Sequence, residues 1–126
     1  MSKAERRLAS RRKAERRGRH SETLAALLLT CKFYRILGRR VRTHAGEIDL
    51  VARSPAGVIC FIEVKAREER DVAAIALGPR QQARIERAAE LFLAQRPALK
   101  PKGVRFDTII VARRGWPRHV RDAWRP

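Results

Sequence analysis

Residues 57–67, GVICFIEVKAR, have the composition of a β-strand that is buried on both faces. The apolar residues of this stretch are Val58, Ile59, Phe61, Ile62 and Val64. Because side chains alternate along a strand, Glu63 and Lys65 lie on the same face. An unpaired ion in an apolar strand costs several kcal/mol, so these two charges need a partner or a function.

A second charged strand precedes this one. Residues 46–53 (GEIDLVAR) are joined to it by SPAG at 54–57, which predicts a short turn and an antiparallel hairpin. A turn centred on 54–56 places Asp49 level with Glu63, so two carboxylates converge beside one ammonium. A divalent cation with a preference for oxygen ligands, Mg²⁺ or Mn²⁺, would neutralise both acids. The simpler alternative is a Glu63–Lys65 ion pair with a solvated Asp49.

Periodicity along the chain predicts the remaining elements. We expect a helix over about 20–33, strands over 34–42, 46–53 and 57–67, a polar loop over 68–78, a helix that begins at Pro79 and stops before Pro97, a strand over 104–113 and a short edge strand around 119–124. A crossover helix between the third and fourth strands indicates that this pair runs parallel. The predicted fold class is therefore α/β, a mixed β-sheet flanked by helices.

The first helix has one apolar side. Its predicted stripe consists of Leu24, Leu27, Leu28 and Cys31, and Ala25, Ala26 and Leu29 widen it. Glu22 precedes Leu29 by seven residues and lies at the end of this buried face. The residue is either a first-turn carboxylate stabilised by the helix dipole or part of a functional site.

The net charge of +17 and the sequence pI of about 11.6 indicate a polyanionic partner, nucleic acid first and an anionic membrane surface second. A basic surface without a specific ligand is the alternative. Residues 1–19 carry nine Lys or Arg against two Glu, so we expect a flexible arm that becomes helical only on a polyanion. Residues 20–126 then form a single domain. Lysine is scarce, 6 residues against 24 Arg, which makes Lys65 more informative.

Cellular location follows from the cysteines and the apolar runs. Cys31 and Cys60 have no metal-ligand spacing, and both are expected to be reduced core residues. The basic N-terminal stretch is too long for a secretory leader, and no apolar run reaches the ~18 residues that span a bilayer. We therefore expect a cytoplasmic protein.

Several of these segments together resemble a known family. Asp49 followed by Glu63-Val64-Lys65 resembles the core of PD-(D/E)xK nucleases, which include many restriction enzymes and archaeal Holliday-junction resolvases. GEIDLVAR, FIEVKAR, RAAELFLA and VRFDTIIV are similar to segments of the YraN family of bacterial proteins, from about residue 18 to the end. The resemblance implies a restriction-endonuclease-like core.

The resemblance also implies roles for individual residues. Asp49 and Glu63 would bind Mg²⁺ or Mn²⁺, with the Val64 carbonyl as a third ligand. Lys65 would orient the attacking water or stabilise the transition-state charge, and Glu22 would complete the site. The implied activity is metal-dependent endonucleolytic hydrolysis of DNA, either branched or single-stranded, in repair or recombination.

The sequence departs from the family pattern at two positions. Ile48 replaces the proline of the family name, and Gln81 stands where a lysine is expected, which puts one phosphate contact in doubt. The residues expected to contact nucleic acid are Arg67, Arg80, Gln81 and Arg84. Asp107 could serve the site or a structural hydrogen-bond network. His44 and His119 have no ligand-like spacing and are expected on the surface or in loops.

Two other functions compete with the nuclease. The first is a non-catalytic nucleic-acid-binding protein, for which basic charge alone suffices. The second is a nuclease fold retained as a protein-docking module. Converging carboxylates discriminate against a pure polyanion binder, because they repel phosphate unless a metal intervenes. A homodimer is a further expectation, from the resolvase-like relatives.

Overall fold

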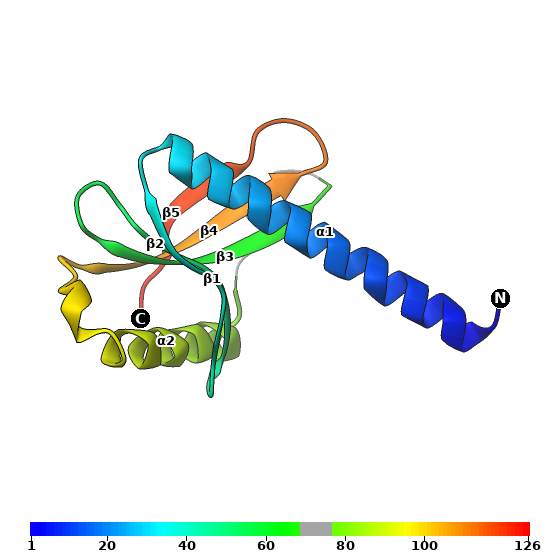
Figure 1. Cartoon of the computed structure of the whole chain (residues 1–126), viewed down its shortest axis with the longest axis horizontal. Helices are drawn as coiled ribbons and strands as arrows, with labels where there is room; N and C mark the ends of the chain where they lie inside the picture. The colour runs from blue at the N-terminus through cyan, green and yellow to red at the C-terminus, as the bar shows by residue number, and fades with distance from the viewer. Residues whose placement is uncertain (69–76) are drawn as a thin grey trace.

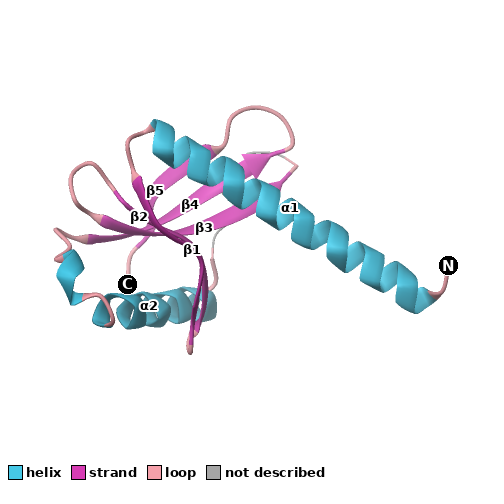
Figure 2. Ribbon diagram, viewed as in Figure 1, coloured by secondary structure: helices cyan, strands magenta, loops and turns pink. Residues whose placement is uncertain are grey.

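The computed structural model describes residues 1–68 and 77–126, without the side chains of 13–17, so most of the loop predicted over 68–78 lies outside the described residues. The elements in chain order are α1 (Lys3–Cys31), β1 (Arg35–Thr43), β2 (Gly46–Arg53), β3 (Ile59–Arg67), α2 (Pro79–Ala94), the 3-10 helix η2 (Pro97–Leu99), β4 (Val104–Ala112) and β5 (Arg118–Trp124). The five strands form one sheet in the order β1-β2-β3-β4-β5 (Figures 1 and 2). The β3–β4 pair is parallel and the other three pairs are antiparallel, which confirms the predicted mixed α/β sheet.

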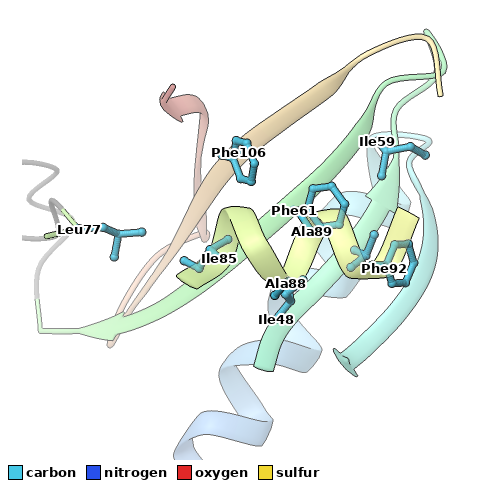
Figure 3. Packing of buried hydrophobic residues seen from close by; sticks show 10 residues of the cluster. Ile48, Ile59, Phe61, Leu77, Ile85, Ala88, Ala89, Phe92 and Phe106 are labelled. Carbon is cyan, nitrogen blue, oxygen red and sulfur yellow. The ribbon is translucent and has the colours of Figure 1, made fainter. Parts of the chain in front are cut away.

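Helix α2 covers one face of the sheet (Figure 1). Alternation along β3 directs Ile59 and Phe61 to this face, where the Phe61 ring meets the Phe92 ring edge-on at 5.8 Å. The core on this side also contains Ile48, Val51, Leu77, Ile85, Ala88, Ala89 and Phe106 (Figure 3). The helix begins at Pro79 and ends before Pro97, as predicted.

Helix α1 covers the opposite face (Figure 2). The buried residues on this side are Ala25, Leu29, Tyr34, Leu50, Ala52, Cys60, Ile62, Ile109 and Val111. The predicted apolar stripe was partly wrong, because Leu27 is 56% exposed and Cys31 is also exposed. Both cysteines are free thiols, and only Cys60 is a core residue. Glu22 does lie on the buried side of the helix.

Helix α1 begins at Lys3 rather than near residue 20, so the predicted start of this helix was wrong. The Ser2 side chain accepts a hydrogen bond from the Glu5 amide and caps the first turn. The following residues are mostly Lys, Arg, Glu and Ala, all strong helix formers. The N-terminal half of α1 projects away from the sheet (Figure 1). Among the described residues, no helix has the length and apolar content to cross a bilayer.

The middle of the sheet separates into two parts. Strands β2 and β3 pair from Arg53↔Ile59 to Leu50↔Ile62. Beyond that point β2 continues with β1 to Gly46↔Thr43, while β3 continues with β4 to Arg67↔Ala112. We call the point where β2 and β3 separate, at Asp49 and Glu63, the fork.

Candidate metal-binding and catalytic site

Asp49 and Glu63 meet at the fork. The register Leu50↔Ile62 puts them level on neighbouring strands, as the turn position predicts. The two side chains are close enough to perturb each other's ionisation, and Asp49 Oδ2 accepts a hydrogen bond of 2.8 Å from the Val64 amide. Further along the ladder, backbone groups of β2 and β3 bond to each other. Where the two strands no longer pair, the Asp49 side chain takes the place of a backbone acceptor.

Two carboxyl groups in this position affect each other's ionisation. Burial, and then the negative charge of Asp49, raises the pKa of Glu63 to about 8. Burial also raises the pKa of Asp49, which the hydrogen bond from Val64 only partly offsets. The pair therefore retains a proton between the two carboxyl groups at neutral pH. A cation placed between them would replace that proton.

Two basic side chains lie close to the pair. Lys65 shares a strand face with Glu63, and its charge lowers the pKa of both acids. Arg84 on α2 acts on Glu63 in the same direction. The Arg84 side chain also lies against Gly46, where an added Cβ would be 2.9 Å from Arg84 Cδ and where φ is +146°. A glycine at the start of β2 thus allows Arg84 to approach the fork.

Glu22 approaches the fork from the α1 side. Its side chain is buried and pairs with Arg40 at 2.7 Å, and its charge raises the pKa of Asp49. Arg40 has a φ of +49° and lies between Arg39 and Val41, which pair with the residues on either side of Asp49. Sequence reasoning missed Arg40, because no local pattern distinguishes it from the neighbouring arginines of β1. Glu22 is thus held by a cation of its own rather than by direct contact with Glu63.

The remaining predicted nucleic-acid contacts are spread around this region. Arg67 is exposed at the end of β3 and donates a hydrogen bond to the Ala66 carbonyl. Arg80 is exposed and Gln81 half-buried in the first turn of α2. His44 is exposed, as predicted.

The donor set at the fork is small. Among the residues that the structure describes, no three His, Cys, Asp or Glu side chains are grouped to hold a metal ion. Mg²⁺ commonly takes only one or two carboxylates and keeps several waters. The Val64 amide faces Asp49, and the N–H and C=O groups of one strand residue face the same neighbour, so the Val64 carbonyl is also directed to the fork. Two carboxylates and one carbonyl therefore fit this ion.

Asp107 does not belong to this group. Its carboxylate is fully buried on the α1 side, where it accepts hydrogen bonds from Arg105, His119 and the Asp122 amide. The structural role left open for Asp107 is therefore the one observed. The prediction for His119 was wrong, since its side chain is only 3% exposed and lies in β5. A partner for Asp107 could not be read from spacing, because the two residues meet only through strand pairing.

A mixed sheet flanked by helices, with acids and a lysine on its central strands, is consistent with a restriction-endonuclease-like core. A family model described as "Uncharacterised protein family UPF0102" matches residues 21–111. The chain belongs to this family, which is the YraN family expected from the sequence.

Curated relatives carry the same family name. A UPF0102 protein of Parvibaculum lavamentivorans is 52% identical over 113 residues, which cover 90% of this chain and 84% of the relative. Another from Maricaulis maris is 50% identical over 117 residues, covering 93% and 91%. A third, from Paramagnetospirillum magneticum, is 50% identical over 116 residues and covers 89% of each chain. The similarity therefore extends over nearly the whole chain.

Proposed function

We propose that this protein is an endonuclease that hydrolyses DNA phosphodiester bonds with Mg²⁺ or Mn²⁺. The observation that carries the proposal is that Asp49 and Glu63 lie level on neighbouring strands at the fork, with Asp49 bonded to the Val64 amide. In a chain of net charge +17, the buried Glu63 and the half-buried Asp49, next to Lys65, oppose phosphate binding by themselves. They favour it once a divalent cation lies between them.

Three groups would hold the ion: the carboxylates of Asp49 and Glu63 and the Val64 carbonyl. The chemistry that such an ion supplies is Lewis acidity toward the phosphate and a lowered pKa of bound water. Glu22 acts on Asp49 from the α1 side, and its negative charge strengthens the attraction for a cation. Arg40, by pairing with Glu22, limits that effect.

Lys65 would act on the substrate rather than on the ion. The Lys65 ammonium is on the same strand face as Glu63 and half-buried, so it presents positive charge next to where the phosphate would bind. In that position it can orient the attacking water and stabilise the charge of the transition state. Arg84 would contact a neighbouring phosphate.

A cleavage assay tests the proposal. Linear, flapped and four-way DNA substrates are incubated with the protein and Mg²⁺ or Mn²⁺. We expect cleavage of at least one substrate, loss of cleavage in EDTA, and loss in Asp49→Ala and Glu63→Ala while salt-sensitive DNA binding persists. Glu47→Ala is the matched control, because Glu47 is an exposed acid on the same strand as Asp49. Full activity in either site variant would refute the assignment, and DNA binding without cleavage in every condition would favour the non-catalytic alternative.

A further inference from the structure

A second group of charged side chains lies on the α1 side of the sheet, around Asp107. Arg105 donates two hydrogen bonds of 2.8 Å to the Asp107 carboxylate, and the Asp122 amide donates one of 2.9 Å. Burial alone would raise the pKa of Asp107, but hydrogen bonds from His119, Arg105 and Asp122 lower it below its usual value. Asp107 is therefore a fixed, buried negative charge.

This carboxylate determines how His119 is oriented. His119 Nε2 lies 2.7 Å from Asp107 Oδ2, and an ionised carboxylate can only accept, so Nε2 carries the hydrogen. The other ring nitrogen, Nδ1, lies 2.7 Å from Lys32 Nζ and accepts from its ammonium. The chain Asp107–His119–Lys32 thus fixes one lysine amine at the C-terminal end of α1.

Positive charge at this point is not balanced. The guanidinium of Arg105 is already occupied by Asp107 and by the Tyr34 hydroxyl. Arg121 lies two residues after His119 on β5, and burial together with the charges of Arg121 and Arg105 lowers the pKa of Lys32. Within residues 1–68 and 77–126, neither Lys32 nor Arg121 forms an ion pair with a carboxylate.

The position of Arg121 depends on the same carboxylate. The β4–β5 register shifts between Phe106 and Thr108, opposite residues 121–123. Asp122 has a φ of +53° there, and its amide is bound by Asp107. Asp107 therefore stabilises the irregular part of β5 that contains Arg121 as well as the ring that orients Lys32.

We propose that Lys32 and Arg121 form a phosphate-binding site, with His119 and Asp107 as positioning residues. An ammonium has three N–H donors, and His119 takes one of the Lys32 donors, which leaves two for a ligand. Arg121 is exposed and adds a guanidinium, which binds phosphate in a bidentate manner. The phosphate is supplied either by a nucleic-acid backbone or by free phosphate.

This site is separate from the fork. Asp107 pairs with Ile62, one residue before Glu63, and its network opens on the α1 face. Alternation along β3 directs Glu63 and Lys65 away from the face of Ile62. A nucleic acid as the source of the phosphate rests on the proposed function. Such a nucleic acid would bind here with a segment other than the one at the fork.

The competing interpretation is purely structural. A cation at the C-terminal end of a helix is stabilised by the helix dipole without any ligand. That role needs the charge of Lys32 but not its fixed direction. A change at His119 that conserves charge separates the two interpretations.

The test is a titration with inorganic phosphate in the absence of divalent cations. Binding is followed through the ring NMR signals of His119. In variants that lack His119, it is followed through the backbone amide signal of Lys32. We expect saturable shifts in the wild type, and an affinity lower by about tenfold in Lys32→Gln and Arg121→Gln, as for the loss of one charge-assisted hydrogen bond. His119→Gln should weaken phosphate binding to a similar extent. Arg114→Gln, at an exposed loop position, should not.

Equal weakening in all four variants, or no weakening in His119→Gln, would overturn the proposal. If His119→Gln does not fold, Lys32→Gln and Arg121→Gln against Arg114→Gln still decide whether a local site exists. Repeating the titration in Asp49→Asn separates this site from the fork, since the proposed nuclease could fail while phosphate binding remains. Titrating the same variants with a short single-stranded DNA identifies the source of the phosphate. Losses of DNA affinity equal to the losses of phosphate affinity indicate a nucleic-acid backbone, and unchanged DNA affinity indicates free phosphate.

Discussion

At the scale of single residues, Glu63 has the most perturbed environment of the fork. Its pKa is raised from 4.5 to about 8, so the folded state keeps a proton that the unfolded state has released in that range. The free energy of unfolding should therefore fall as pH rises from 4.5 to about 8 when no divalent cation is present. Glu63→Gln should remove most of this loss. Urea denaturation at a series of pH values measures it.

The control for this prediction is Glu47→Gln, which changes an exposed acid on the neighbouring strand β2. Its pH dependence should match that of the wild type. A wild-type stability that falls no more steeply than that of Glu63→Gln would show that Glu63 ionises normally, and the close approach to Asp49 would then be wrong.

Arg40 provides a second test at this scale. Its guanidinium compensates the buried carboxylate of Glu22, with a distance of 2.7 Å. Arg40→Gln should lower the free energy of unfolding, because the buried Glu22 charge loses its partner. Arg42→Gln is the matched control: Arg42 is 88% exposed and 3.6 Å from Glu47, so its removal should change stability by less than about 1 kcal/mol. Equal effects in urea denaturation would contradict the assigned pairing.

Individual residues could be predicted where strand geometry determines them. The level position of Asp49 and Glu63 followed from a short turn and the alternation of side chains. Arg40 and His119 could not be found in this way. Arg40 depends on a positive φ within β1, and His119 on the pairing of β5 with β4.

At the scale of elements, the strands and α2 were predicted to within a few residues, because Pro, Gly and apolar runs mark their ends. The start of α1 was missed because the prediction relied on an apolar stripe, which residues 3–19 lack. The missing signal was Ser2 followed three residues later by Glu5, together with strong helix formers. Amphipathic patterns locate the part of a helix that packs, not the part that projects.

The turn between β1 and β2 supports an element-scale prediction. Gly46→Ala should destabilise the protein by about 1–3 kcal/mol, since φ is +146° and the new Cβ meets Arg84 at 2.9 Å. Gly18→Ala is the control, because no atom of the described side chains lies within 4 Å of a Cβ there. It should stabilise α1 by up to about 1 kcal/mol. Thermal unfolding followed by circular dichroism compares the two, and equal effects would contradict the packing of Arg84 on the hairpin.

At the scale of the whole molecule, charge is distributed between a folded body and a projecting helix. Residues 1–12 are exposed throughout, and this end of α1 extends from the sheet (Figure 1). Deleting residues 1–17 should weaken DNA binding about equally across sequences and reduce its salt dependence, because fewer counterions are released. Fluorescence anisotropy at several salt concentrations measures the slope. An unchanged slope would show that the helix does not contact DNA.

The central claim is that Asp49 and Glu63 together bind a divalent cation, and calorimetric titration with Mn²⁺ tests it most directly. Repeating the titration in buffers of different ionisation enthalpy counts the protons released. We predict that the wild type and Glu47→Gln bind Mn²⁺ and release a proton from the carboxyl pair, whereas Asp49→Asn/Glu63→Gln does not bind. Mn²⁺ binding of wild-type affinity in the double variant would contradict the account.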